Sequence, residues 1–205
     1  MIEELKELII LIENEYQRNN ILWRNDSRYK KINLNKKQVC HIYDCGIIET
    51  VFDYKSFLTN NLINFNLQLK NWNKNASRVN TRIKNQNSIE FKIDNYIKKK
   101  EHGTTRINKC LNDLFGARII LKGYYTFEEI KQYINVCFPK LKCIASIKQE
   151  YKAMHIYFKE DNYTFPWELQ IWLEQDEKNN LISHAKYKED YAQWEKRAKE
   201  ETFNG

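Results

Sequence analysis

The stretch of the chain that most restricts its fold is FPWELQIW, residues 165–172, in which a carboxylate and an amide interrupt a run of apolar side chains. Alternate side chains of a β-strand share a face, so Glu168 and Gln170 point to one side of a sheet. The other side receives only large apolar residues: Trp167, Leu169, Ile171 and Leu173. The pattern predicts a strand with core on one face and the wall of a site on the other.

Two segments before this strand have the period of amphipathic helices. The first seventeen residues carry one apolar stripe, formed by Ile2, Leu5, Ile9, Ile12 and Tyr16. After an irregular stretch over residues 20–50, a second, long helix is predicted by the stripe Leu58, Leu62, Phe65, Leu69 and Trp72. We expect both helices to serve packing rather than chemistry.

From Ser77 onward the pattern changes to alternating strands and helices. SRVNTRIK, GARIIL (residues 116–121) and the segments 141–148, 152–159 and 165–174 are predicted strands. Helices are expected at residues 87–100, with an Asn or Ser cap and Ile89, Ile93, Tyr96 and Ile97 buried, and at 176–198. A third helix is predicted for TFEEIKQYINVCF, where Thr126 and Glu129 have capping-box spacing. Its expected buried face is formed by Phe127, Ile130, Tyr133, Ile134 and Cys137.

This order of elements predicts an α/β (α+β) fold, with a mixed sheet of about five strands flanked by helices and an N-terminal helical extension. The expected division is a helical region over residues 1–76 that packs on the core, a core domain over 77–199 and a tail over 200–205. A chain of 205 residues is long enough to bury such a core without disulfides or metals.

Composition excludes several classes of protein. Five glycines and two prolines leave little room for linkers or collagen-like repeats. The longest apolar run near the start, LIILI, is too short to span a bilayer and lacks a small-residue cleavage site. We therefore expect a cytoplasmic protein that does not contact a membrane.

Five cysteines without paired spacing suit a reducing compartment better than a disulfide framework. The segment CHIYDC, from Cys40 to Cys45, contains residue types that zinc uses. No second cluster lies nearby in the sequence, so buried or surface thiols are the simpler interpretation.

The net charge of +7 favours anionic partners such as polyphosphates and nucleic acid. Lysines occur in clumps, among them Lys30 with Lys31 and Lys36 with Lys37. For any single clump, a solvated surface is the alternative.

RIKNQNSIEFK combines a basic strand end with a helix start. Arg82 and Lys84 share one face of the strand, and Ser88 and Lys92 are one helical turn apart. A helix N-terminus with lysines, an arginine and a hydroxyl converging on it predicts a polyphosphate site. The arginine is also able to stack on a purine ring. The alternative is an ordinary basic strand followed by a helix.

Four further residues are weak signals singly. Asp113 precedes a buried strand, where an Asp is usually a turn residue, and His155 faces opposite to Met154 and Ile156 on a strand. The other two are Glu168 and Gln170, on the polar face of the strand at residues 165–174. Two acidic residues able to hold Mg²⁺, a histidine and a phosphate site together are the parts needed for phosphoryl transfer from a nucleotide.

Five ordered motifs, RIKNQNSIEFK, LNDLFGARII, YKAMH, WELQIW and SHAKYK, resemble the synthetase domain of RelA/SpoT homologues, especially the single-domain small alarmone synthetases. The resemblance covers about residues 77–191. It implies a mixed sheet flanked by helices, and transfer of the β,γ-pyrophosphate of ATP to a ribose 3′-hydroxyl with release of AMP.

The resemblance also implies roles for individual residues. Arg82 would stack on adenine, and the ATP phosphates would be held by Lys84, Ser88 and Lys92, with Arg118 also on the ATP side. Asp113 would bind Mg²⁺, and Glu168 would bind it too or take the proton of the attacking hydroxyl. An Asp113→Asn variant is then expected to fold normally. Tyr151 would stack on the acceptor base, supported by His155, Gln170 and His184.

Two departures fall on the acceptor side. Family members that make (p)ppGpp usually have Asn-Gly before the stacking tyrosine and an arginine after the Glu-x-Gln-x segment, whereas this chain has Gln149, Glu150 and Trp172. The sequence most resembles the toxic members of toxin–antitoxin pairs, some of which pyrophosphorylate the 3′ CCA end of tRNA.

The leading hypothesis is therefore a tRNA-modifying toxin neutralised by an antitoxin protein. Lys30, Lys31, Lys36 and Lys37 are its candidate tRNA-binding residues, since they lie outside the motifs. The alternatives are a GDP/GTP 3′-pyrophosphokinase that makes (p)ppGpp and a non-catalytic RNA-binding module.

Overall fold

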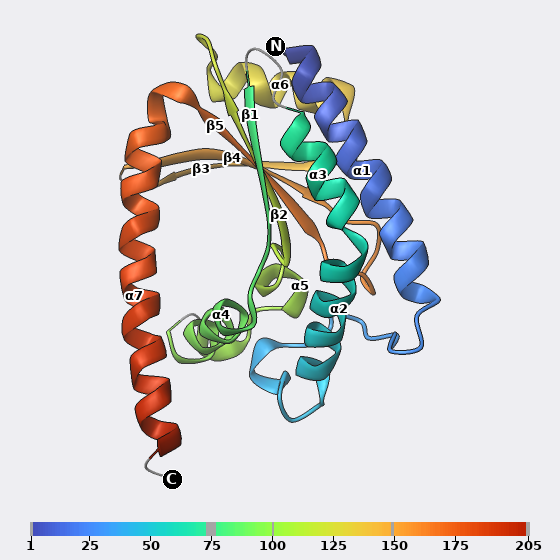
Figure 1. The fold of residues 1–205 in the computed structure, drawn as a ribbon, viewed down its shortest axis with the longest axis vertical. Helices are drawn as coiled ribbons and strands as arrows, with labels where there is room; N and C mark the ends of the chain where they lie inside the picture. Colours follow the sequence, from blue (N-terminus) through green and yellow to red (C-terminus); the bar gives the residue numbers. More distant parts are fainter. Residues whose placement is uncertain (1, 73–76, 100, 149, 204–205) are drawn as a thin grey trace.

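A computed structural model describes residues 2–72, 77–99, 101–148 and 150–203 (Figure 1). Its centre is a five-stranded sheet of order β1-β2-β5-β4-β3. β2 and β5 are parallel, and every other neighbouring pair is antiparallel. The predicted mixed sheet is confirmed. The strands are β1 (Ser77–Ile83), β2 (Phe115–Leu121), β3 (Lys142–Lys148), β4 (Tyr151–Phe158) and β5 (Trp167–Leu173).

Helices lie on both sides of this sheet. Figure 1 shows α1, α2 and α3 on one side and α7 on the other, with α4 and α5 near one end of the strands. Short 3-10 helices lie at Val39–His41, Glu101–Gly103 and Glu174–Asp176. The helices are α1 (Ile2–Arg24), α2 (Ile47–Asn61), α3 (Ile63–Asn71), α4 (Gln86–Lys98), α5 (Ile107–Cys110), α6 (Phe127–Cys137) and α7 (Glu177–Phe203). No helix of the described residues is both long and apolar enough to cross a membrane.

The hydrophobic core fills the space between the sheet and helices α1 to α3. Leu8 and Ile12 of α1 and Leu169 and Ile171 of β5 are fully buried in one cluster. Each such side chain contributes about 1.5–3 kcal/mol to the free energy of unfolding. The predicted apolar face of the last strand is thereby confirmed as core.

Aromatic packing at the start of β5 fixes the register of that strand. The Trp167 indole donates a 2.9 Å hydrogen bond to the Tyr54 hydroxyl, and its ring lies 4.3 Å from that of Phe115. A slip of one residue would move Trp167 to the opposite face of the sheet. The core therefore holds Glu168 and Gln170 on the face turned toward α7.

Two helix boundaries in the N-terminal part differ from the expected ones. α1 continues to Arg24, seven residues past its expected end, because the buried Asn20 amide bonds to Glu160. The single long helix predicted across Leu62 is divided into α2 and α3. Before the division, the Asn61 amide bonds to the Phe57 carbonyl, so a side chain competes with the backbone for that acceptor.

Other corrections concern helix caps and burial. The N-cap of α4 is Asn85, whose side chain accepts a 2.8 Å hydrogen bond from the Ser88 amide, so the helix begins earlier than expected. The capping box of Thr126 and Glu129 is confirmed. The predicted burial of Cys137 is wrong: the helix ends there, and Phe138 packs against the core instead. Tyr96, Ile97 and Tyr133 are only half-buried, and α7 extends to Phe203.

Candidate active site

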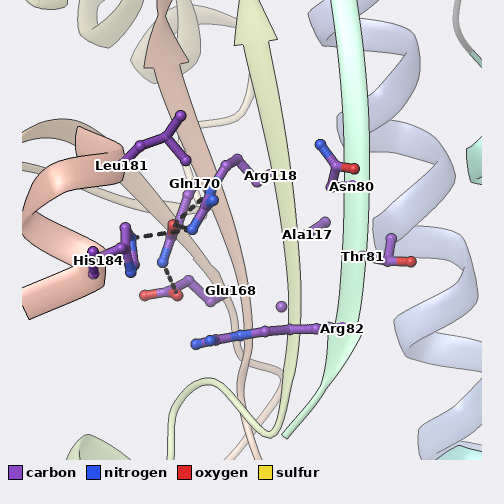
Figure 2. Close-up of a pocket in the computed structure, with 11 residues that line it drawn as sticks. Asn80, Thr81, Arg82, Ala117, Arg118, Glu168, Gln170, Leu181 and His184 are labelled. Atoms are coloured by element: carbon purple, nitrogen blue, oxygen red, sulfur yellow. Dashed lines mark hydrogen bonds between the residues drawn. The ribbon is translucent and has the colours of Figure 1, made fainter. Parts of the chain in front are cut away.

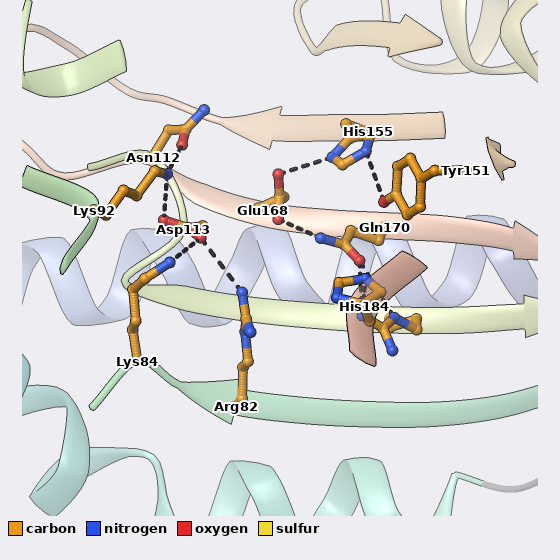
Figure 3. Close-up of polar contacts among 11 residues, drawn as sticks. Arg82, Lys84, Lys92, Asn112, Asp113, Tyr151, His155, Glu168, Gln170 and His184 are labelled. Atoms are coloured by element: carbon orange, nitrogen blue, oxygen red, sulfur yellow. Dashed lines mark hydrogen bonds and ion pairs between the residues drawn. The ribbon is translucent and has the colours of Figure 1, made fainter. Parts of the chain in front are cut away.

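The polar face of β5 meets polar side chains from both neighbouring strands. Glu168 lies opposite Tyr157 of β4, and Gln170 lies between His155 of β4 and Arg118 of β2. Residues paired across strands point to the same face, so the sheet alone brings these five side chains together. Figure 3 shows this face with the helical residues that close over it.

A chain of hydrogen bonds fixes the Glu168 carboxylate (Figure 3). His155 Nδ1 lies 2.8 Å from its Oε1, and the Gln170 amide donates to its Oε2 at 2.8 Å. An ionised carboxylate only accepts hydrogen bonds, so Nδ1 carries the imidazole proton. Nε2 is then an acceptor for the Tyr151 hydroxyl, 3.2 Å away.

The same network continues to α7 through Arg118 (Figure 2). The Arg118 guanidinium donates to Gln170 Oε1 at 3.1 Å and lies 3.1 Å from His184 Nε2. It also stacks over the Trp172 ring, with 3.6 Å between the guanidinium carbon and the ring centroid. His184 lies over the same buried indole at 5.3 Å between centroids. The Trp172 ring therefore packs against both the Arg118 guanidinium and the His184 imidazole.

Burial and hydrogen bonding set the charge states of this network. Burial lowers the pKa of Arg118 to about 10, which leaves it cationic at neutral pH. Burial disfavours the charged form of Glu168, but the hydrogen bonds from His155 and Gln170 outweigh it and the pKa lies below its ordinary value. Burial raises the pKa of Tyr151 to about 12, so its hydroxyl keeps its proton.

Across from this network, one carboxylate is surrounded by three cations. Asp113 Oδ2 accepts a 2.6 Å hydrogen bond from Lys84 Nζ and lies 3.4 Å from the Arg82 guanidinium. Its Oδ1 lies 2.9 Å from Lys92 Nζ, which also donates to Asn112 at 3.2 Å. The cations come from β1, the residue that follows it and α4, so the β1–α4 connection assembles the cluster.

The cluster keeps an excess of positive charge below the surface. The Lys84 side chain is only 7% exposed, and burial lowers its pKa to about 8, with the charges of Lys92 and Arg82 acting in the same direction. For Lys92, burial is outweighed by Asp113 and the pKa is raised; the pKa of Asp113 lies far below its usual range. Three cations against one carboxylate favour binding of a further anion.

Two cavities join these groups into one site. The first, about 270 Å³, lies between the Asp113 cluster with Ser88 and the pair Tyr151 and His184. The second, about 280 Å³, runs from Arg82 past Arg118 to Leu181 (Figure 2). Arg82 and His184 line both, so an extended ligand with a polyanionic part fits the combined space.

The two acidic residues fit a magnesium ion by their chemistry. The charge of Asp113 acts against the hydrogen bonds that lower the pKa of Glu168, so the two carboxylates are close enough to interact. Mg²⁺ is typically held by one or two carboxylates together with substrate phosphates. In the described part of the chain, no three His, Cys, Asp or Glu side chains form a group that would hold a metal by themselves, and Cys40 and Cys45 are free thiols.

Neither a protein-family model nor a curated relative matches the sequence. Among solved structures, the fold is similar to small alarmone synthetase 1 from Bacillus subtilis, with 14% identity and a TM-score of 0.41 over 73% of this chain and 82% of that one. It is also similar to small alarmone synthetase 2 from Bacillus subtilis, with 18% identity and a TM-score of 0.39 over 69% of this chain and 79% of that one.

The structure brings together every residue predicted for catalysis, ATP and acceptor: Arg82, Lys84, Ser88, Lys92, Asp113, Arg118, Tyr151, His155, Glu168, Gln170 and His184. Arg118, expected on the ATP side, contacts the Gln170 network rather than the Asp113 cluster. Asn112 and Tyr157 were not predicted as site residues, although Tyr157 alternates with His155 along β4. The lysines proposed for tRNA are exposed and lie between α1 and α2: Lys30, Lys31, Lys36 and Lys37.

Proposed function

We propose that the chain is an ATP-dependent pyrophosphokinase that transfers the β,γ-pyrophosphate of ATP to a ribose 3′-hydroxyl. The observation that supports it best is the arrangement of charge around the two adjoining cavities. On one side lies a buried cluster with more cations than carboxylates, and near it an ionised glutamate is fixed by a histidine. Phosphoryl transfer depends mainly on positioning and on stabilising phosphate charge, which these groups provide.

The donor binds at the Asp113 cluster. Lys84 and Lys92 contact the ATP phosphates, aided by Ser88 in the first turn of α4, where backbone amides favour anions. The Arg82 side chain is 52% exposed, so one face of its guanidinium is available to stack on adenine. Asp113 keeps the two ammonium groups in place before ATP arrives.

The transfer step forms a bond between the acceptor 3′-oxygen and the β-phosphorus of ATP. The bond between the β-phosphorus and the oxygen that bridges it to the α-phosphate breaks, and AMP leaves. Glu168 receives the proton of the attacking hydroxyl, and His155 and Gln170 hold the carboxylate in position. Tyr151 lines the cavity and is placed to stack on the acceptor base. A Mg²⁺ ion bound by Asp113 and Glu168 would neutralise charge on the phosphates.

The acceptor we propose is the 3′ CCA end of tRNA, which makes the protein an inhibitor of translation that an antitoxin protein neutralises. The net charge of +7 and the exposed Lys30, Lys31, Lys36 and Lys37 favour a large polyanion. Trp172, where (p)ppGpp-making members of the resembled family usually carry an arginine, is buried and lines neither cavity. It offers no charge to an acceptor phosphate.

The position of the label in ATP tests this function. With purified protein and tRNA, ATP labelled with ³²P at the β-phosphate and ATP labelled at the γ-phosphate should label the 3′ end of tRNA equally, whereas α-labelled ATP should yield labelled AMP. A simple kinase would transfer only the γ-label. Labelling of GDP or GTP with tRNA left unlabelled would contradict the tRNA acceptor but keep the chemistry.

A variant pair examines the basic surface in the same assay. Lys30→Gln/Lys31→Gln should lower tRNA labelling and its dependence on salt, because fewer phosphates are contacted. ATP binding should stay normal, since both lysines lie outside the two cavities. Lys6→Gln/Lys122→Gln removes the same charge from elsewhere and should label tRNA at the wild-type rate.

ATP affinity should fall as pH rises above 8. The pKa of Lys84 is lowered to about 8, so its ammonium is present below that pH and lost above it. The dissociation constant of a non-hydrolysable ATP analogue should then rise about fivefold between pH 8 and 9, where ATP itself is fully ionised. The Lys84→Gln variant should bind the ATP analogue weakly at pH 7 and should lose no further affinity as the pH rises. Wild-type affinity that stays constant to pH 9.5 would exclude Lys84 from the phosphate site.

A further inference from the structure

A third cavity, of about 360 Å³, lies beside the active site and is lined by four lysines: Lys109, Lys140, Lys142 and Lys159. We call these four residues and the cavity the lysine groove. Within the described part of the chain, none of their ammonium groups lies within 4 Å of a carboxylate. The cations of the Asp113 cluster share a counter-ion at hydrogen-bond distance, whereas no such ion pair is formed by the described lysines of the groove.

The sheet crowds two of these charges together. Lys142 of β3 lies opposite Tyr157 of β4, and Lys159 directly follows that strand. Burial lowers the pKa of Lys159; the charge of Asp161 opposes this shift and the nearby charge of Lys142 adds to it. Like charges placed close together destabilise a fold unless an anion lies between them.

The groove adjoins both halves of the active site. Tyr157 lines the groove, and its ring stacks on His155 with 6.3 Å between centroids and 20° between planes. Asn112 also lines it and accepts a hydrogen bond from Lys92 of the Asp113 cluster. Tyr157 is also the cross-strand neighbour of Glu168. A ligand whose terminal hydroxyl reaches Glu168 would therefore need to pass only the Tyr157 side chain to extend into the groove.

Beyond Lys159, contacts of Asn162 and Tyr163 connect the groove to the loop after α1. The Lys159 ammonium donates to the Asn162 side chain at 2.9 Å, and the Asn162 carbonyl accepts from the Leu34 amide at 2.8 Å. Lys31 lies over the Tyr163 ring, 5.2 Å from its centroid. The groove and the exposed lysines of this loop are thus linked through residues 159–163, where Glu160 and Asp161 pair with Arg24.

We propose that the lysine groove binds the phosphodiester backbone of an RNA acceptor, directly 5′ of the nucleotide whose 3′-hydroxyl is modified. This inference rests on the proposed function and specifies its acceptor as a polynucleotide. Four lysines that form no ion pair with the described residues and line one cavity, near the lysine-bearing loop after α1, suit a succession of phosphates. The groove has one aromatic ring, Tyr157, so it contacts backbone more than bases.

The test is direct RNA binding without ATP. Lys140→Gln/Lys142→Gln is compared with Lys6→Gln/Lys122→Gln, which has the same charge and changes lysines that line none of the three cavities. Fluorescence anisotropy with a CCA-ended RNA is measured from 50 to 300 mM salt. The groove variant should bind about tenfold more weakly at 100 mM salt, and its slope of log K against log salt should fall by about 1.4, or roughly 0.7 per lost contact.

The outcomes separate this inference from the proposed function. Unchanged RNA affinity in the groove variant overturns the groove proposal, whether or not tRNA is labelled by ATP. Weakened RNA binding with an unchanged control supports it, even if transfer to tRNA fails. If GDP is an acceptor and its KM rises by the same factor in the groove variant, the groove holds the 5′-phosphates of a mononucleotide and the RNA proposal is overturned. The lysines are exposed, so the variant should fold, and its melting temperature checks this.

Discussion

Replacing Glu168 by glutamine is expected to lower pyrophosphate transfer by about 10²–10⁴-fold while ATP affinity changes by less than about threefold. Both carboxylate oxygens accept hydrogen bonds, from His155 and from Gln170. The amide cannot take the proton of the attacking hydroxyl, and its NH₂ group would face one of those two donors. Single-turnover transfer from β-labelled ATP and the dissociation constant of a non-hydrolysable analogue separate chemistry from binding.

The matched control is Glu174→Gln, which changes an exposed carboxylate just after β5 and should leave transfer at the wild-type rate. The pKa of Glu168 lies below its ordinary value of 4.5, so ionisation of this group should not limit the wild-type rate until the pH falls below that value. A glutamine variant that transfers at the wild-type rate would remove Glu168 from the mechanism.

The catalytic face was predictable because a period of two is a strong signal when one face is apolar. Residues 167–171 alternate apolar and polar side chains, and Trp172 ends the alternation. Because Leu169 and Ile171 are buried in the core, Glu168 and Gln170 must point to the opposite face. The sheet order then places His155 and Arg118 beside them. Their contribution to one site was implied by the ordered motifs, not by any one of them.

Contacts between distant residues were not predictable in the same way. Asp113 meets Lys84 and Lys92 at separations of 29 and 21 residues, and no local pattern marks the pairing. The lysine groove is even harder to predict, because nothing in the sequence distinguishes its four lysines from the many others in the chain. Only the β3–β4 pairing and the position of α5 bring Lys109, Lys142 and Lys159 to one cavity.

Helix ends were missed where side chains interact with distant partners or with the backbone. Asn20 interrupts the apolar stripe of α1, yet the helix continues because Glu160, 140 residues away, accepts its amide hydrogen. The division at Leu62 follows polar residues whose side chains bond to carbonyls of the preceding turn. Periodicity identifies which face of a helix is buried, whereas such individual bonds decide where the helix stops.

Asp113→Asn is expected to lower the free energy of unfolding by about 3 kcal/mol and to abolish measurable transfer. From the sequence alone, this variant would be expected to fold normally. The structure makes the carboxylate the shared counter-ion of Lys84, Lys92 and Arg82, so its loss leaves buried positive charge without compensation. Urea denaturation measures the change, and Asp44→Asn, at an exposed position, should unfold like the wild type.

A second substitution and the pH separate lost charge compensation from lost shape. Adding Lys84→Met to Asp113→Asn should recover part of the stability, because one of the repelling cations is gone. In Asp113→Asn itself, the pKa of Lys84 should fall further below 8, so between about pH 6 and 8 the unfolded chain binds more protons than the folded one. The variant should therefore gain stability relative to the wild type as pH rises through that window. If the stability lost in Asp113→Asn is the same at every pH and is not recovered by adding Lys84→Met, Asp113 stabilises the fold by packing rather than by balancing charge.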